Sequence, residues 1–511
     1  MIATIATSAL MGIDALPVAL EIDFSRQGLP AFVMVGLAEG AVRESKERVF
    51  SALKSSGYKL PPARITVNLA PADVRKEGSA YDLPLAVGLM AAAGIIPAEA
   101  LHGWHLAGEL SLTGGLKPVH GALSMAALAR AKDAKGLILP QANAAEASVV
   151  EGLPVYGAAS LAQVVGHLLG HEELAPCACD LQALWREHER FLLDFSEVKG
   201  QEHAKRAIEI AAAGNHNLLF LGPPGSGKTM LARRIPTVLP PLSFGEALEV
   251  TKVYSVSGSL PPDTPLMVTR PFRSPHHTIS DAGLIGGGHY PKPGEVSLAH
   301  CGVLFLDELP EFKKHVLEVL RQPLEDGQVT ISRAAISLCY PASLMLVAAM
   351  NPCPCGYLGD ERHACSCSDM AVQRYRSRLS GPLLDRIDLH VEVPAVDYKE
   401  LRAVGQGSDS ASMRERILAA RKVQAERYAG LPLLTNSQLS GRLLERFCHL
   451  GEAEHAFLEQ AVRRLGLSAR AFTRILRIGR TIADLAGVER LEVSHLAEAI
   501  NYRSMDRQVT S

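Results

Sequence analysis

Apolar and polar residues alternate between residues 18 and 24, which is the period of a strand with one buried face. Residues 31–35 and 64–69 are further strand-like runs, whereas residues 39–55 and 83–93 repeat apolar positions at helical spacing. Strands interleaved with helices predict an α/β domain with a mixed sheet. After Pro394 the pattern is helical to about residue 502, without a convincing strand.

These patterns divide the 511 residues into four parts. Residues 1–168 form the first α/β domain, and residues 169–195, which are polar and charged, form a linker. Residues 196–395 form a second α/β block, and residues 396–511 form a helical C-terminal domain. Several domains are expected because a chain of this length is too long for one hydrophobic core.

Composition and charge limit which partners and which cellular location we expect. Hydrophobic residues make up 47% of the chain and the formal net charge is −2, so any contact with nucleic acid must come from a local basic patch. No Lys or Arg precedes Arg26, unlike in a signal peptide, and the longest apolar run, residues 83–97, is too short to span a membrane. We therefore expect a cytoplasmic protein.

A glycine-rich run directly follows the short apolar strand expected at residues 217–221 and opens a helix. Its members are Gly222, Pro223, Pro224, Gly225, Ser226, Gly227, Lys228 and Thr229. The glycines let backbone N–H groups surround phosphates, Lys228 would reach the β- and γ-phosphates, and the Thr229 hydroxyl would bind Mg²⁺. The alternative is a glycine turn that matches by chance, which the flanking strand and helix disfavour.

Polar residues end two later apolar strands. Residues 303–306 end in Asp307 and Glu308, of which the first would hold Mg²⁺ through water and the second would activate the attacking water. Residues 344–350 end at Asn351, whose side chain can orient that water. A surface Asp-Glu pair is the alternative, and the four apolar residues before it make that alternative weak.

Together these residues resemble the AAA+ ATPases, which implies a P-loop core, ATP with Mg²⁺, and Asn351 as the first sensor. In AAA+ rings an Arg in the context of Arg386 reaches into the neighbouring ATP site as a finger. The alternative for Arg386 is a local ion pair with Asp385 or Asp388. Arg470 begins a helix and is the candidate second sensor, with Arg474 as its rival.

More specific strings coincide with these motifs. They are V-K-G-Q at 198–201, R-P-F-R-S-P-H-H at 270–277, G-G-G at 286–288 and P-G-E-V-S-L-A-H at 293–300. Over essentially the whole chain they resemble the magnesium-chelatase-like branch of AAA+ ATPases, within it the bacterial competence proteins. The resemblance implies a ring, a hexamer, that acts as a DNA helicase and drives branch migration during natural transformation.

The first domain resembles the Lon-protease-like (ribosomal S5 domain 2-like) α/β domain. Residues 109–114 with Pro118 match the second Lon motif, and residues 76–80 resemble the stretch that holds its nucleophile. The nucleophile position falls on Ala80, with Ser79 one residue early, and the catalytic lysine position falls on Leu123. A Ser–Lys dyad needs both groups, so we expect a catalytically degenerate domain. The resemblance makes residues 396–511 a helical lid.

Nine cysteines include two C-x-C pairs soon after Asn351. The members of these pairs are Cys353, Cys355, Cys365 and Cys367. Four thiolates satisfy tetrahedral Zn²⁺. The alternative is four reduced thiols on a loop, with His363 as a substitute ligand. Cys177 and Cys179 alone are too few for a site.

DNA contact is expected from residues 330–340, which alternate like a hairpin with Arg333 near its tip. A second candidate is an arginine stripe that would meet backbone phosphates, and the alternative is a solvated face plus ATP contacts. The stripe consists of Arg463, Arg464, Arg470, Arg474, Arg477 and Arg480. Two rival functions remain: the ATPase subunit of a metal-insertion complex, and a protein remodeller or Lon-like protease.

Overall fold

The computed structural model of the chain describes residues 2–37, 40–187, 191–288, 291–333, 336–360, 362–396 and 407–503. The chain forms two compact units: Met1–Glu187 with Phe244–Val268, and His188–Ser243 with Thr269–Ser511. The segment Phe244–Val268 therefore groups with the N-terminal residues, although it lies within the block of residues 196–395. Among the described residues, no helix is long and apolar enough to cross a membrane.

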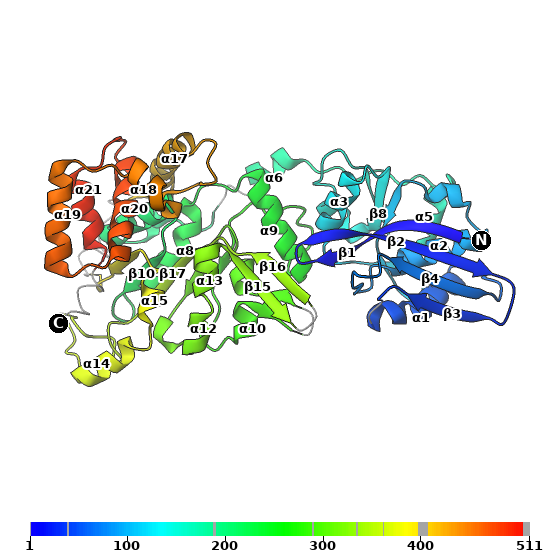
Figure 1. Cartoon of the computed structure of the whole chain (residues 1–511), viewed down its shortest axis with the longest axis horizontal. Coiled ribbons are helices and arrows are strands. Elements are labelled where there is room, and N and C mark those ends of the chain that lie inside the picture. Colours follow the sequence, from blue (N-terminus) through cyan, green and yellow to red (C-terminus); the bar gives the residue numbers. More distant parts are fainter. Residues whose placement is uncertain are drawn as a thin grey trace. The chain divides into compact units, whose positions relative to one another are not determined.

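The first unit is built on a seven-stranded sheet in the order β3-β4-β2-β1-β5-β8-β9 (Figure 1). Its strands are β1 (Ile2–Met11), β2 (Asp14–Ser25), β3 (Ala31–Val35), β4 (Arg64–Ala70), β5 (Trp104–Leu106), β8 (Gly136–Pro140) and β9 (Val155–Ala158), and a separate pair consists of β6 (Glu109–Leu110) and β7 (Leu116–Lys117). Strand β1 pairs antiparallel with β2 and parallel with β5. The mixed sheet expected from the sequence is confirmed.

Helices cover both faces of this sheet. The helices of this unit are α1 (Gly40–Ser55), α2 (Asp82–Ala92), α3 (Ala122–Ala131), α4 (Gln141–Ala147), α5 (Leu161–Leu168), α6 (Leu181–Glu187) and α9 (Phe244–Ser257), with the 3-10 helix η1 (Ala98–Leu101). On β8, Ile138 joins the core under α1 and α2, whereas Leu137 and Leu139 join the core under α3 and α4. Alternate residues of one strand thus reach two cores. The alternation in residues 18–24 likewise buries Val18 and Phe24.

The second unit contains a five-stranded parallel sheet in the order β11-β14-β17-β10-β18. Its strands are β10 (Leu218–Leu221), β11 (Phe272–Arg273), β14 (Val303–Leu306), β17 (Met345–Met350) and β18 (Leu389–Glu392), and two hairpins are formed by β12 (Gly286–Gly287) with β13 (Lys292–Pro293) and by β15 (Gln328–Arg333) with β16 (Ile336–Pro341). The strand order reverses beside β10, and open α/β sheets bind ligands at such a point, outside the carboxyl ends of the strands.

The helices of this unit fall into two groups. Those around the sheet are α7 (Glu202–Gly214), α8 (Lys228–Val238), α10 (Asp281–Leu284), α11 (Glu295–Leu298), α12 (Lys314–Glu318), α13 (Arg321–Asp326), α14 (Asp369–Arg376) and α15 (Gly381–Leu384), with η2 (Phe195–Glu197) and η3 (Leu309–Glu311). The C-terminal group is α17 (Ser410–Arg427), α18 (Gly441–Phe447), α19 (Glu452–Leu465), α20 (Ala469–Leu485) and α21 (Val493–Asn501), with η4 (Asn436–Gln438).

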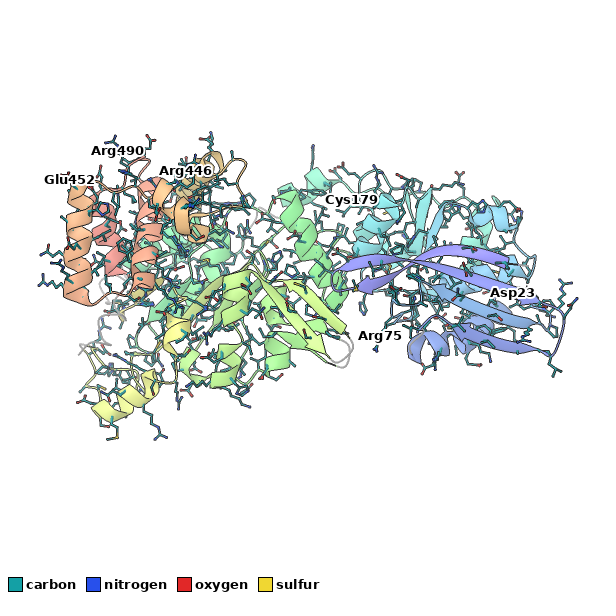
Figure 2. The ribbon with its side chains drawn as sticks, viewed as in Figure 1. Asp23, Arg75, Cys179, Arg446, Glu452 and Arg490 are labelled. Atoms are coloured by element: carbon teal, nitrogen blue, oxygen red, sulfur yellow. The ribbon has the colours of Figure 1, made fainter. Side chains whose placement is uncertain are left out.

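The C-terminal helices share one hydrophobic core with the sheet, which joins residues such as Phe220 and Val347 to Ile417 and Ile475. Figure 2 shows exposed side chains on this group, among them Arg446 and Arg490. As the sequence predicts, no strand follows β18 in the described part of the chain.

Candidate nucleotide site

The carboxyl ends of three neighbouring strands carry the polar residues of the candidate site. The glycine-rich loop follows β10, Asp307 follows β14, and Asn351 follows β17. Because parallel strands end at one edge of a sheet, residues distant in the sequence meet there. The structure thus brings together the groups that the sequence placed at strand ends.

The loop between β10 and α8 takes a form that only glycine fits at key points. Gly225 and Gly227 have φ angles of +75° and +93°, in the left-handed region that side chains disfavour. A Cβ atom at Gly222 would lie 2.1 Å from the carbonyl oxygen of Val393. The hydroxyl of Ser226 is buried and has no hydrogen-bond partner among the described residues. An unsatisfied buried hydroxyl inside this loop is ready for a phosphate oxygen.

Lys228 is the first residue of α8 and its side chain folds back over the loop. Its Nζ donates to the carbonyl oxygens of Gly222 and Pro223, each at 2.8 Å, and to Oδ1 of Asn351 at 3.2 Å. Burial lowers the pKa of Lys228 from its usual value, against the pull of the nearby acids. These neutral oxygens therefore hold the ammonium group where a phosphate would provide a stronger, charged partner.

Two residues suited to Mg²⁺ are already in contact. Thr229 Oγ1 donates to Oδ2 of Asp307 at 2.7 Å, and the backbone N–H of Glu308 donates to Oδ1 of the same carboxylate at 3.0 Å. Glu308 has a φ of +52° and its side chain is 59% exposed. The carboxylate of Asp307 is thus fixed from both sides, whereas that of Glu308 faces solvent.

His277 is a neighbour of this acid that the motif analysis did not assign. Its Nδ1 lies 3.5 Å from Oε2 of Glu308, and its ring is tilted against that of His276 at 4.1 Å. His277 belongs to the string at residues 270–277, so the signal was present in the sequence without a role. The arginines of the same string have structural partners: Arg273 forms a two-bond pair with Glu295, with distances of 2.6 and 2.7 Å.

Asn217, just before β10, connects several strand ends. Its Oδ1 accepts the N–H of Leu346 at 2.8 Å, and its Nδ2 donates to the carbonyl oxygen of Arg386 at 2.8 Å. The asparagine therefore ties the turn before β18 to β17. This residue too was missed by the motif analysis.

Arg386 pairs within its own chain with a residue that the sequence did not suggest. Its guanidinium donates to Glu325, at the end of α13, and to the carbonyl oxygen of Pro382, and its side chain is 9% exposed. The partners considered from the sequence, Asp385 and Asp388, pair instead with Arg470 and Arg474.

The two candidate second sensors differ in environment. Arg470 is 67% exposed and lies 3.1 Å from Asp385, whereas Arg474 is 12% exposed and lies 3.3 Å from Asp388. Burial raises the pKa of Asp388, but His216 and Arg474 outweigh it and hold that pKa well below the usual range. The position of Arg474 is therefore that of a buried structural charge.

The expected arginine stripe is not one exposed face. Arg480 is 3% exposed and pairs with Asp484, and Arg477 donates to the carbonyl oxygen of Leu439. Only part of the stripe is open to solvent, because its inner members neutralise acids and carbonyls of the helical core. Arg463, Arg464 and Arg470 are exposed.

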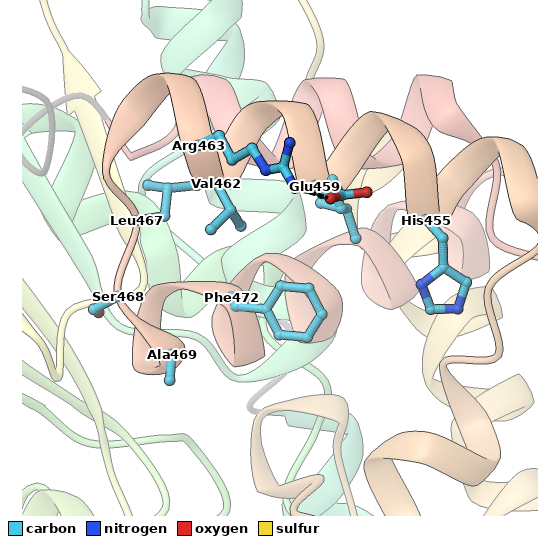
Figure 3. A pocket seen from close by; sticks show the side chains of 9 residues that line it. His455, Glu459, Val462, Arg463, Leu467, Ser468, Ala469 and Phe472 are labelled. Carbon is cyan, nitrogen blue, oxygen red and sulfur yellow. Dashed lines mark ion pairs between the residues drawn. The ribbon is translucent and has the colours of Figure 1, made fainter.

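An open hollow of about 510 Å³ lies between α19 and α20, immediately before Arg470 (Figure 3). Leu458, Val462 and Phe472 supply its apolar lining, and Arg463 and Glu459 form an ion pair of 2.6 Å at its rim.

Comparison with known proteins identifies the chain. The family model for magnesium chelatase, subunit ChlI, matches residues 194–401, and models for further parts of that subunit match residues 20–143 and 407–503. The chain is 47% identical to competence protein ComM of Haemophilus influenzae over 99% of this chain and 98% of that protein. The chain belongs to the magnesium-chelatase-like AAA+ ATPases. The family expected from the sequence is confirmed.

Other relatives show how far this similarity extends. The chain is 44% identical to the uncharacterized protein YifB of Escherichia coli over 98% of this chain and 97% of that protein. Similarity to the magnesium-chelatase 38 kDa subunit of Rhodobacter capsulatus is weaker, with 27% identity over 32% of this chain and 51% of that subunit. Within the magnesium-chelatase-like ATPases, the chain is thus similar at full length to the competence protein.

Membership in this family implies ATP and Mg²⁺, and the residues present fit both. The glycine-rich loop supplies a free buried hydroxyl and a lysine at a helix N-terminus. Thr229 and Asp307 supply the hydroxyl and carboxylate oxygens that Mg²⁺ prefers. The site can therefore support metal-assisted hydrolysis of a phosphate anhydride.

The four cysteines of the two C-x-C pairs also meet in space. Their sulfur atoms all lie within 4.8 Å of one another. His363, the substitute ligand considered from the sequence, is directed elsewhere: its Nδ1 lies 3.0 Å from Oδ2 of Asp360.

Proposed function

We propose that this ATPase is a ring-shaped DNA motor, a hexamer, that promotes branch migration in homologous recombination during natural transformation. The observation that carries the proposal is the similarity over nearly the whole length to a competence protein. The meeting of Lys228 with Asn351 and of Thr229 with Asp307 at one edge of the sheet supports it. ATP hydrolysis would supply the work, and DNA would be bound without regard to sequence.

In the proposed mechanism the residues at the strand ends divide the work. Lys228 would leave the loop carbonyls to neutralise charge on the phosphates, while Thr229 and Asp307 would hold the metal. Mg²⁺, when bound, neutralises phosphate charge and makes the phosphorus more open to attack. Glu308 accepts a proton from water, and Asn351 orients that water. Arg386 would act on the ATP site of a neighbouring subunit after release from Glu325.

We infer that residues 1–168 form a Lon-protease-like domain without peptidase activity and that residues 396–511 form the helical lid. The missing dyad supports the first assignment. The hydroxyl of Ser79 donates to Glu109, and the ammonium group of Lys76 donates to the carbonyl oxygen of Pro71. Both groups therefore have partners other than each other.

DNA contact is assigned to the hairpin β15–β16, with Arg333 at the end of β15, and to the exposed residues Arg463 and Arg464. An affinity for DNA that rests on phosphate contacts of this kind falls steeply as the salt concentration rises. The rival function is the ATPase subunit of a metal-insertion complex, supported by the family models and the partial match to the chelatase subunit. The similarity to the competence protein covers 99% of this chain, against 32% for the chelatase subunit, and this difference favours the DNA motor.

The test measures ATP hydrolysis by the purified chain with single-stranded DNA, a four-way DNA junction, an unfolded protein or a porphyrin. The proposal expects stimulation by DNA and movement of the junction that needs ATP, both absent from Glu308→Gln. Stimulation by the porphyrin or the unfolded protein, with none by DNA, would favour a rival and overturn the proposal.

A further inference from the structure

Four thiols from two C-x-C pairs converge beside the candidate nucleotide site. The sulfur of Cys353 lies 3.3 Å from that of Cys355 and 3.7 Å from that of Cys365, and Cys355 and Cys365 are 3.6 Å apart. Cys367 completes the group, in which all sulfurs lie within 4.8 Å of one another. Backbone N–H groups of Cys355 and Cys367 point at sulfurs of the group, each at 3.4 Å.

The distances between the sulfurs distinguish a zinc site from a disulfide and from an iron–sulfur cluster. Four sulfurs about 2.3 Å from a central zinc ion form a tetrahedron with edges of about 3.8 Å. Disulfides need about 2.05 Å between sulfurs, so no pair here is bonded. Iron–sulfur clusters divide their cysteines among two or more irons, which spreads the sulfurs over the width of the cluster. The N–H groups favour thiolates over thiols, because hydrogen bonds to a charged form stabilise it.

The segment that carries the four cysteines runs from just after Asn351 to the start of α14. Cys353 lies two residues after Asn351, and Cys367 directly precedes Ser368, whose hydroxyl accepts the N–H of Ala371 and starts α14. At its other end this helix returns to the start of the segment: Nε of Arg376 donates to the carbonyl oxygen of Pro352 at 3.4 Å. A metal at the four sulfurs would therefore close a loop whose base holds Asn351.

The same segment also rests on the glycine-rich loop. A Cβ atom at Gly356 would lie 2.6 Å from Cδ of Pro224 and 3.9 Å from the side-chain amide carbon of Asn351. Gly356 has a φ of +87°, so a larger residue there is disfavoured both by backbone strain and by the contact. The backbone between the cysteine pairs thus lies close to both the phosphate loop and Asn351.

We propose that Cys353, Cys355, Cys365 and Cys367 bind one structural zinc ion that holds residues 352–360 against the phosphate loop and so positions Asn351. All four ligands come from the chain, so no position is open for catalysis by the metal. Binding displaces one proton from each thiol that is not yet ionised. Zinc binding is independent of the proposed motor function, whereas the effect on Asn351 rests on the nucleotide site.

Metal content tests the site directly. Chain purified without chelators and analysed for zinc and iron should carry about one zinc ion per chain. The double variant Cys353→Ser/Cys365→Ser should lose it. The matched control is Cys177→Ser/Cys179→Ser, which removes another C-x-C pair (Cys179 is labelled in Figure 2) and should keep the zinc. A metal-free parent chain, or one that holds iron in place of zinc, overturns the proposal.

Cobalt substitution in the parent chain avoids any folding defect of the variant. Co²⁺ should give the intense absorption of tetrahedral thiolate coordination, which zinc should displace. Absence of this absorption in folded chain, together with free reaction of Cys355, Cys365 and Cys367 with a thiol reagent, overturns the site.

Gly356→Ala separates metal binding from its consequence. It should keep the zinc yet raise the KM for ATP by about tenfold, because small displacements of positioned groups have large effects. Unchanged KM in both Gly356→Ala and zinc-stripped chain overturns the positioning role. Failure of DNA to stimulate hydrolysis would overturn the motor proposal alone and leave the zinc content unaffected.

Discussion

The hydroxyl of Thr229 donates a hydrogen bond of 2.7 Å to the carboxylate of Asp307. The two residues follow β10 and β14, which are not neighbours, because β17 lies between them in the sheet. The bond therefore passes across the end of β17. There, Oδ1 of Asn351 accepts a hydrogen bond of 3.2 Å from the ammonium group of Lys228. Three strand ends converge before any nucleotide binds, and metal binding would replace the direct bond between hydroxyl and carboxylate.

Single substitutions at this site should separate nucleotide binding from ATP hydrolysis. Lys228→Ala should abolish ATP binding, because the ammonium group has no substitute within the loop. Glu308→Gln should bind ATP normally but hydrolyse it about 10²–10⁴-fold more slowly, the usual contribution of a general base. Fluorescent-nucleotide binding and phosphate release measure the two properties. Glu311→Gln is the matched control, since Glu311 is an exposed acid three residues away that pairs with Arg378. Near-normal turnover of Glu308→Gln would remove that residue from the mechanism.

The pair between Arg386 and Glu325 sharpens the test for a finger that acts between subunits. Arg386→Ala should bind ATP, since Lys228 and Thr229 are intact, but should hydrolyse it poorly. Mixing it with Lys228→Ala should restore part of the activity, by up to about 10³-fold per repaired site, because some interfaces join an intact loop to an intact finger. Phosphate release from titrated mixtures is the measurement.

Glu325→Gln is the companion variant for this test, because it releases Arg386 without removing it. It should keep most of the hydrolysis rate. If Arg386 served only to pair with Glu325 in its own chain, the two single variants would share one folding defect and mixing would restore nothing.

Removal of Arg474 should lower the stability of the protein, whereas removal of Arg470 should lower its rate of ATP hydrolysis. Arg474→Ala leaves the carboxylate of Asp388 buried without this partner, so it should destabilise the second unit by about 3 to 5 kcal/mol. Arg470→Ala removes an exposed pair and should change stability by less than about 0.5 kcal/mol while lowering hydrolysis. Thermal unfolding and phosphate release distinguish them. A stable Arg474→Ala chain with lost hydrolysis would instead make Arg474 the second sensor.

How far the sequence predicted this site depends on the range of each interaction. The loop from Gly222, Asp307 with Glu308, and Asn351 were all predictable, because each ends an apolar strand and parallel strands end at a common edge. Interactions between distant segments were not. Glu325 is 61 residues from Arg386, and nothing local indicates the pair. The arginine pattern indicated helix α20, but the burial of Arg474 depends on Asp388, which lies outside that helix.

Acid sensitivity of the first unit should come in part from His105, which lies on β5 and is 3% exposed. Burial lowers the pKa of His105 to about 4, from an ordinary value near 6.5. Between these values the unfolded chain binds the proton and the folded chain does not, so stability falls as the pH falls. Between pH 7 and pH 5, this histidine should lower the free energy of unfolding by about 2 kcal/mol.

Tryptophan fluorescence can follow this loss in the full chain, because both tryptophans, Trp104 and Trp185, belong to the first unit. Urea unfolding at pH 7 and pH 5 should show a smaller difference for His105→Leu than for the parent, by about 2 kcal/mol. His102→Gln is the matched control, since His102 is exposed and should leave the parent's difference unchanged. All other titrating groups are common to the parent and both variants, so their contributions cancel in the comparison. An equal pH dependence for His105→Leu and the parent would mean that His105 gains its proton in the folded unit as readily as in the unfolded chain, and burial would then not be what keeps it neutral.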